Sequence, residues 1–280
     1  MIRNKKTEAV KTVLTYVFLT VMVVISVFPI VWMLDSSLKG SSEIYSSPPT
    51  FTIHEVTMEN YVRVLFDSGI PRAFLNSVIV SVTATLTTLT LGCLAGYGFS
   101  RYRFKGRRML YVGLLYGQMM PAVVLIIPVY LVFSKIGLID SYFSLILPDV
   151  AITVPLATLM LKSFFDGVPV ELEDAARIDG ASKLGILWKI IIPIAKPGLV
   201  SVAIYTFLST WEEFIFALNL TNSSSIRTLP IAINMFKGEF IIDWGAIMSS
   251  GAVISLPVIL LFVLCNKAFV KGLSEGGVKG

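Results

Sequence analysis

The sequence predicts an all-α membrane protein with six transmembrane helices. Of its 280 residues, 55% are hydrophobic and only 15% are charged, and the mean hydropathy is +0.80. A soluble domain has about a quarter of its residues charged, so this composition is typical of a chain that lies in a bilayer. Six apolar stretches provide the roughly 20 residues that a helix needs to cross the hydrocarbon, or nearly so. They are residues 12–34, 73–100, 109–134, 141–161, 197–211 and 244–266. Because they are continuously apolar and do not alternate, a β-barrel is not expected.

The first apolar stretch follows a basic start and could be mistaken for a signal peptide. Its core, residues 13–34, is longer than the roughly 7–15 residues of a signal sequence, and no small-residue cleavage site follows it. We therefore expect a retained helix. The segment 35–72 follows on the outer side, and within it residues 59–66 have an amphipathic pattern that predicts a short helix lying at the membrane interface.

The distribution of Lys and Arg predicts the orientation. If both termini lie on one side, that side holds seventeen of the 23 basic residues, in segments 1–11, 101–108, 162–196 and 267–279. The other side holds six. Short loops with an excess of Lys and Arg stay in the cytoplasm, so both termini and the loops 101–108 and 166–196 are expected there. The protein is then a multi-pass protein of a bacterial inner or plasma membrane.

Several classes of protein are excluded by what the sequence lacks. Cys93 and Cys265 both fall in apolar stretches and His54 stands alone in an outer segment, so no disulfide or metal site can be proposed. There is no phosphate-binding glycine loop and no GxSxG motif. The basic residues do not form an aromatic-interleaved patch, which argues against nucleic acid as a partner. We therefore expect a non-catalytic chain that binds no cofactor itself.

The loop at 166–196 is the most charged part of the chain between apolar spans, and its pattern predicts a helix, a turn and a second helix. Pro169 suits the start of a helix, and acidic residues at its first turn favour the positive end of the helix dipole. Glu173 and Arg177 are four apart and can pair. Gly180 can end the helix and Ser182 can cap the next one. The alanines here allow close approach, so the loop predicts a docking surface for another protein.

The same residues carry a resemblance to a known family. The loop resembles the EAA motif of inner-membrane subunits of ATP-binding-cassette importers, with Asp174 where Glu is usual and Ile192 where Leu is usual. The matching positions are Asp174, Ala175, Ala176, Asp179, Gly180, Ala181, Ile190 and Pro193. The resemblance implies that this loop, Arg177 included, forms a coupling helix that seats in a cleft of an ATPase subunit.

A second set of segments resembles the maltose-type carbohydrate permeases, in particular their shorter subunit with a carboxy-terminal tail. These segments are WEEFIFAL at 211–218, RTLP at 227–230 and the tail GLSEGGVKG at 272–280. Glu212 stands where Asn is common, and Gly277 where Ala is common. The similarity covers essentially the whole chain and implies a carbohydrate as cargo, most simply an oligosaccharide.

What the resemblance implies for the architecture is a type I importer permease core with cytoplasmic coupling helices. The expected divisions are an amino-terminal part with the first helix and outer loop at 1–72, the importer transmembrane domain at 73–266, and a cytoplasmic tail at 267–280. The implied partners are a homologous permease, two cytoplasmic ATPase subunits that hold ATP and magnesium, and an external solute-binding protein. A permease for a non-sugar solute and an ion-coupled secondary transporter are the alternatives, the latter disfavoured by a single deep acid and no inverted halves.

Several residues are candidates for the substrate pathway, six of them main ones and Tyr97 and Tyr116 in addition. Asp149 is an acid inside a span, where a charge costs about 2.5–3.5 kcal/mol, so it should face a cavity or a partner. Both a hydrogen bond to sugar hydroxyls and a structural bond to another helix remain open for it. Trp211 with Glu212 and Glu213 combines an aromatic ring with acceptors, as sugar sites do, although an interfacial Trp explains the ring equally well. Gln118 and Asn219 are weaker candidates, as are Tyr97 and Tyr116.

Overall fold

The computed structural model describes residues 5–238 and 240–277, with side chains over 11–238 and 240–265. In this part of the chain every named element is a helix, and an isolated antiparallel bridge joins Lys237 and Ile242. The expected all-α class is confirmed. The longest helices are α1 (Lys5–Ser37), α4 (Ile70–Arg101), α7 (Tyr142–Asp166) and α14 (Trp244–Gly277). The other helices of eight or more residues are α3 (Glu59–Phe66), α5 (Arg107–Met119), α6 (Ala122–Lys135), α8 (Val170–Ile178) and α11 (Lys196–Trp211). Shorter helices are α2 (Ser41–Ile44), α9 (Lys183–Ile186), α10 (Ile192–Ile194), α12 (Ile215–Leu220) and α13 (Leu229–Asn234).

The predicted spans divide into four continuous ones and two broken ones. Four of the described helices are each long and apolar enough to cross a membrane: Lys11–Ser37 within α1, α4, α7, and Trp244–Cys265 within α14. The pair α5 and α6 is bent by 102° and the pair Lys183–Ile194 and α11 by 84°, so the count reaches six if each pair is one span. Proline accounts for both breaks, because Pro121 and Pro197 have no backbone N–H to continue a helix.

The chain folds as two compact units. One contains the described residues up to Pro71 together with Ile233–Ser255, and the other contains Arg72–Ala232 and the described residues from Leu256 onward. The division expected at 72–73 on sequence therefore falls near a boundary between units, but the first unit also includes a distant segment of the chain. The helix α14 continues to Gly277, so most of the expected tail at 267–280 is helical, and residues 278–280 lie outside the described part.

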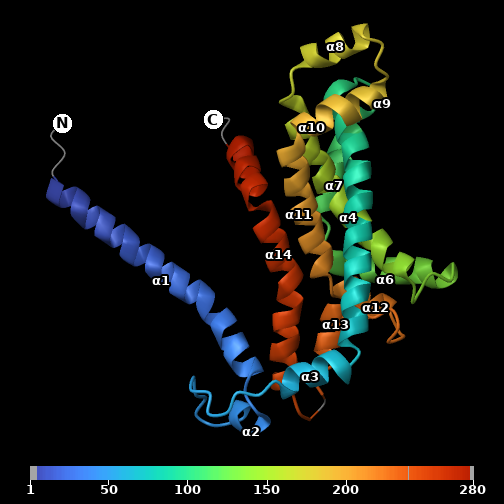
Figure 1. The fold of residues 1–280 in the computed structure, drawn as a ribbon. Coiled ribbons are helices and arrows are strands. Elements are labelled where there is room, and N and C mark those ends of the chain that lie inside the picture. Colours follow the sequence, from blue (N-terminus) through green and yellow to red (C-terminus); the bar gives the residue numbers. More distant parts are fainter. Residues whose placement is uncertain (1–4, 239, 278–280) are drawn as a thin grey trace. The chain divides into compact units, whose positions relative to one another are not determined.

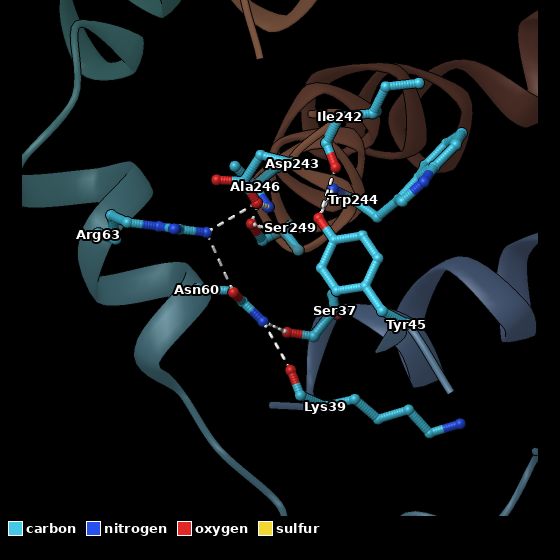
Figure 2. Close-up of polar contacts among 11 residues, drawn as sticks. Ser37, Lys39, Tyr45, Asn60, Arg63, Ile242, Asp243, Trp244, Ala246 and Ser249 are labelled. Carbon is cyan, nitrogen blue, oxygen red and sulfur yellow. Dashed lines mark hydrogen bonds and ion pairs between the residues drawn. The ribbon is translucent and has the colours of Figure 1, made fainter. Parts of the chain in front are cut away.

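In the first unit, polar contacts hold the segment between α1 and α4. Figure 2 shows Asn60 of α3 donating to the carbonyl oxygens of Ser37 (3.2 Å) and Lys39 (2.9 Å). Arg63 of the same helix forms an ion pair with Asp243, 2.9 Å between Nη2 and Oδ1. The predicted helix at 59–66 is thus confirmed as α3, and its buried face is formed by Asn60 and Val64.

The apolar side of α3 that the sequence suggests is left uncovered. Val62, Leu65 and Phe66 are 50%, 40% and 79% exposed, respectively. A short helix with one polar, hydrogen-bonded face and one exposed apolar face suits an interface between water and hydrocarbon. The position of α3 at the membrane interface stays a prediction.

In the second unit, α4 and α7 pack closely through two glycines. A Cβ added at Gly92 would lie 3.2 Å from the Cβ of Ala157, and one at Gly96 would lie 3.1 Å from the backbone nitrogen of Lys162. This small-xxx-small spacing lets two helix backbones approach in a membrane, where lipid gives no hydrophobic drive for association. One helical turn away, Thr88 and Thr153 share a hydrogen bond of 2.8 Å between the two helices. Helices α4 and α7 are thus in close contact at these two glycines.

Two loops at one end of the second unit are joined through Asp140. Its carboxylate accepts hydrogen bonds from the backbone N–H groups of Asn222 (2.9 Å) and Ser223 (3.0 Å). These bonds, that from Ser223 first, hold the pKa of this carboxyl below its usual value. The residue has a positive φ of 61°, which Asp tolerates better than most side chains.

Candidate functional site

The charged loop of the second unit folds as the sequence predicts, into a helix, a turn and a helix. Figure 1 shows α8 and α9 together at one end of α4, α7 and α11. Helix α8 begins after Pro169, which is the N-cap residue, with Glu171 and Glu173 in its first turn. It ends at Ile178 and is closed by Gly180 at a φ of +82°.

The end of α8 is a Schellman turn. The N–H of Gly180 donates to the carbonyl of Arg177 (3.0 Å), and the N–H of Ala181 donates to the carbonyl of Ala176 (2.9 Å). These two bonds satisfy carbonyls that would otherwise be left open at the helix end. Ser182 then caps α9, because its hydroxyl accepts from the N–H of Gly185 at 3.1 Å. The turn is therefore closed by local bonds on both sides.

The return from the loop to the core passes through an irregular helix. After α9 the chain forms a π-helical segment, Leu187–Ile191, and then the short helix α10. Ile186, Leu187 and Ile191 are fully buried and belong to the core formed with α4 and α7. Pro193, one of the positions that match the EAA motif, lies in α10 and is exposed. The second helix of the loop is thus anchored by apolar packing.

The first helix is anchored by a buried carboxylate. Glu173 is 0% exposed, although it lies in a charged loop. Its Oε2 accepts a hydrogen bond of 2.9 Å from the hydroxyl of Tyr97, and its Oε1 accepts one from Nε of Arg101. Arg177 lies 3.6 Å from Oε2, as the spacing of four predicts. A buried charge is stable only when it is paired and hydrogen-bonded, and here both oxygens are occupied.

Arg101 extends this network to the beginning of the loop. Its Nη2 donates to the carbonyl of Val168 (2.8 Å) and its Nη1 to the hydroxyl of Ser100 (2.8 Å). Ser100 in turn donates to Asp166 (2.6 Å), which forms an ion pair with Lys162 (2.5 Å). The last turn of α4 therefore holds the end of α7, the connection to α8 and α8 itself. We call Tyr97, Arg101 and Glu173 the α4–α8 clamp.

The opposite face of the loop is exposed. Asp174, Ala175, Asp179, Gly180 and Ala181 are exposed. Ala176, which the sequence analysis placed on the docking surface with the other alanines, is instead half-buried against the core. Arg177 is half-exposed and pairs with Asp174 at 2.8 Å. Beside these residues are large apolar side chains that sequence reasoning did not single out: Ile178 is 87% exposed, Leu184 59% and Trp188 52%.

The aromatic candidate for the pathway is a core residue in this chain. Trp211 is only 1% exposed. Phe207 stacks on its ring with centroids 5.5 Å apart, and Phe74 meets it edge-on at 5.7 Å. Since its ring is covered by these two side chains, Trp211 does not offer a free face to a sugar within the subunit.

The acidic candidates have different surroundings. Glu213 caps α12: its Oε1 accepts from the N–H of Phe216 (2.7 Å) and its Oε2 from the N–H of Ala217 (2.9 Å). Asp149 is buried, with 5% of its surface exposed. Glu212 is exposed, as are Gln118 and Asn219, and the Asn219 amide bonds to the carbonyl of Ile215 in its own helix (2.7 Å).

Tyr97 and Arg101 form a contact with Glu173 that the sequence analysis did not predict. Tyr97 was considered for the pathway, and Arg101 only as part of a basic loop. Their spacing of four residues puts both on one face of α4, and Glu173 and Ala176 likewise share the inner face of α8. That spacing is the signal that could have indicated a contact, but nothing in it names the partner.

These features define a multi-pass all-α membrane protein with a charged helix–turn–helix loop at one end. The chain belongs to the family of binding-protein-dependent transport system inner membrane components, whose family model matches residues 88–275. Membership in this family is consistent with a membrane component rather than an enzyme. The EAA-like loop lies within the matched region.

Two relatives match over nearly their whole length. The trehalose/maltose transport system permease protein MalG of Thermococcus litoralis is 36% identical over 276 residues, which are 98% of this chain and 99% of that protein. The sulfoquinovosyl glycerol transport system permease protein SmoH of Agrobacterium fabrum is 33% identical over 267 residues, 95% of this chain and 94% of that protein. A solved bacterial ABC transporter involved in the import of alginate has the same fold, with a TM-score of 0.83, 21% identity, and coverage of 96% of this chain and 100% of that chain.

Proposed function

We propose that this chain is a permease subunit of an ATP-binding-cassette importer and that it couples ATP hydrolysis to transport through α8. The observation that carries the proposal is the α4–α8 clamp, which fixes one face of α8 to a membrane span while Ile178, Ala175 and Gly180 stay exposed on the other. A helix held in this way moves with α4 as one body when a partner pushes on its free face. ATP hydrolysis itself, with its magnesium, belongs to separate ATPase subunits.

The proposed cargo is a carbohydrate. The relatives carry names with trehalose and maltose, sulfoquinovosyl glycerol, and diacetylchitobiose, all of them sugars or glycosides. The proposed assembly pairs this chain with a homologous permease and adds two ATPase subunits and an external solute-binding protein. A related solved structure is an alginate transporter in complex with a periplasmic protein that holds an alginate pentasaccharide, which supports this composition. In the proposed orientation both termini and α8 face the cytoplasm.

The surroundings of the candidate residues support a smaller set of proposed sugar contacts. Trp211 is covered by its own subunit, and each oxygen of Glu213 already accepts from a backbone N–H group, so both are less suited to contact a sugar than an open side chain. Asp149, Glu212, Gln118 and Asn219 remain candidates, the last three because they are exposed in the isolated chain. We propose that most contacts with the cargo come from the homologous permease.

Uptake into proteoliposomes separates this proposal from a secondary transporter. The complete complex should accumulate a labelled oligosaccharide only when ATP is supplied on the side of the membrane where the ATPase subunits lie. Omission of the ATPase should abolish uptake. Uptake driven by a proton or sodium gradient without the ATPase would establish the secondary transporter instead. If amino acids compete for uptake and sugars do not, the chain would still be an importer permease, but its cargo would not be a carbohydrate.

Gly180→Val tests the coupling element directly. The φ of +82° makes a Cβ cost roughly 1–2 kcal/mol at this position, although the space around it is open. The spans do not depend on this turn, so the subunit should insert and pair with the homologous permease. We expect uptake to fall at least tenfold while the ATPase either dissociates or hydrolyses ATP without transport, as measured by uptake and phosphate release from one preparation.

Gly137→Val is the matched control. Gly137 has a φ of +70° with nothing within 4 Å of an added Cβ, so the backbone cost is similar, but it lies in the turn after α6 and far along the chain from α8. Coupling should survive in this variant. If Gly180→Val transports normally and retains the ATPase, α8 is not the coupling element.

A further inference from the structure

A basic cavity lies beside the α4–α5 connection and has no part in the coupling site. It has a volume of about 1220 Å³, and four of the side chains that line it are cationic: Arg103, Arg107, Arg108 and Lys162. None of its lining residues is acidic. A concentration of positive charge around an open cavity predicts an anionic ligand.

Most of this charge is not neutralised by the protein. In the part of the chain whose side chains are described, Arg103 and Arg108 make no ion pair or hydrogen bond with their side chains, and both are exposed. Arg107 donates to the carbonyl oxygen of Phe99, a neutral group, so its charge remains. Lys162 is the exception, since it pairs with Asp166 at 2.5 Å. Three arginine charges are therefore available to a ligand.

Apolar side chains continue from the cavity along α5. Phe104 and Met109, which line it, are 43% and 80% exposed, and Leu110 next to them is 55% exposed. Tyr111 forms another part of the wall and receives Lys162 over its ring at 5.8 Å. A small hydrophilic anion would make no favourable contact with these apolar side chains. A ligand with an anionic group and a hydrocarbon chain would contact both parts of it.

The position of the cavity in the chain agrees with a ligand that lies in the membrane. α4 ends at Arg101 and α5 begins at Arg107, and both belong to candidate spans. The connection between them is five residues long, so the three arginines lie where hydrocarbon meets water. Lys162 and Val112 line the same cavity from inside the spans.

We propose that this cavity binds the phosphate headgroup of an anionic phospholipid, with an acyl chain along Met109 and Leu110. Basic pockets between transmembrane helices are the usual form of such sites. The phosphodiester oxygens accept from the guanidinium groups of Arg103 and Arg108, which can bind phosphate with two parallel hydrogen bonds. The bound lipid stabilises the turn between α4 and α5 at the same end of the unit as the α4–α8 clamp.

Native mass spectrometry of the complete complex tests the proposal. The complex is released from nanodiscs of phosphatidylglycerol and phosphatidylethanolamine, and the lipids that stay bound are counted. Each basic residue near an anionic headgroup is worth a factor of about five in binding. Arg103→Gln and Arg108→Gln together should therefore lower the preference for phosphatidylglycerol about 25-fold, without loss of the ATPase subunits.

Lys105→Gln is the matched control, because Lys105 lies in the same connection and is exposed but does not line the cavity. It should leave the retained phosphatidylglycerol unchanged. If Lys105→Gln loses as much bound phosphatidylglycerol as the double variant, the lipid is attracted by the basic loop in general and not by the cavity. That result would overturn the proposal. Displacement of the lipid by millimolar inorganic phosphate would assign the cavity to a free anion, and loss of the ATPase from the double variant would assign it to protein docking. Either result would also overturn it.

Discussion

Glu173 shows how a single buried carboxylate can connect a loop to a membrane span. It points away from the water that surrounds the rest of α8 and reaches Tyr97 and Arg101 on α4. The side chain of Arg101 is only 9% exposed, so each charge of this pair depends on the other. Removing one partner of a buried pair costs about 3–5 kcal/mol, because the other charge is left without compensation.

Glu173→Ala should therefore detach α8 without unfolding the spans. We expect faster protease cleavage between 166 and 182, a lower thermal stability of the purified complex, and uptake reduced relative to ATP hydrolysis. Glu171→Gln is the control, since Glu171 is exposed in the same turn of the helix. If both variants behave alike, the α4–α8 clamp does not hold the loop.

Glu213 is a second residue whose role the structure redefines. Its two oxygens receive the first free N–H groups of α12, which makes it a helix cap rather than an open acceptor. Glu213→Gln keeps one acceptor and turns an amide NH₂ toward an N–H. We expect a loss of about 0.5–2 kcal/mol in the stability of the complex.

The KM for sugar uptake should stay unchanged in that variant, and thermal unfolding and uptake measured on the same sample would check both expectations. Glu212→Gln provides the comparison, because Glu212 is the exposed neighbour. If Glu213→Gln raises the KM for sugar uptake and leaves the stability unchanged, Glu213 contacts the sugar after all.

At the scale of elements, the contact between α4 and α7 depends on the absence of side-chain atoms. A Cβ at Gly96 would lie within 3.1–3.2 Å of Lys162 and Leu161 as well as the carbonyl oxygen of Thr158. Two of these three atoms belong to the backbone of α7 and cannot rotate away. The helices must separate slightly if Gly96 is replaced.

Gly96→Ala should lower the stability of the complex by about 1–3 kcal/mol, the usual cost of an additional group in a packed interior. Gly98→Ala is the control two residues later in the same helix, where an added Cβ meets nothing within 4 Å. It should be neutral within about 0.5 kcal/mol. Differential scanning fluorimetry of both complexes in one lipid mixture would compare their melting temperatures. Equal melting temperatures would show that the contact between α4 and α7 tolerates a methyl group.

The elements that the sequence predicted best are those defined by neighbours in the chain. The boundaries of α8, its Schellman turn and the Ser182 cap follow from local hydrogen bonds, so the pattern of Pro169, Gly180 and Ser182 was sufficient. The α4–α8 clamp could not be predicted, because its partners are 72 and 76 residues apart. The breaks at 120–121 and 195–196 were also not specified, since composition counts apolar residues and does not give a bend angle.

At the scale of the whole chain, the orientation rests on the distribution of Lys and Arg. In a background with Cys93 and Cys265 replaced by Ala, single cysteines at Gly180 and Ser224 place a label on α8 and on the loop before α13. An impermeant maleimide added to intact cells should label position 224 and leave position 180 unlabelled until the cells are opened. Labelling of 180 from outside would invert the topology.

The α4–α8 clamp also has a consequence for the biosynthesis of the chain. Glu173 follows Arg101 by 72 residues, so at roughly 5–20 residues per second the ribosome needs about 4–14 s to supply the partner. During that interval the guanidinium of Arg101 cannot pair with Glu173, and the end of α4 stays accessible to water and proteases. Closing the clamp is thus a late step of translation, and a chain whose synthesis stops before Glu173 keeps Arg101 accessible to trypsin while the completed chain protects it.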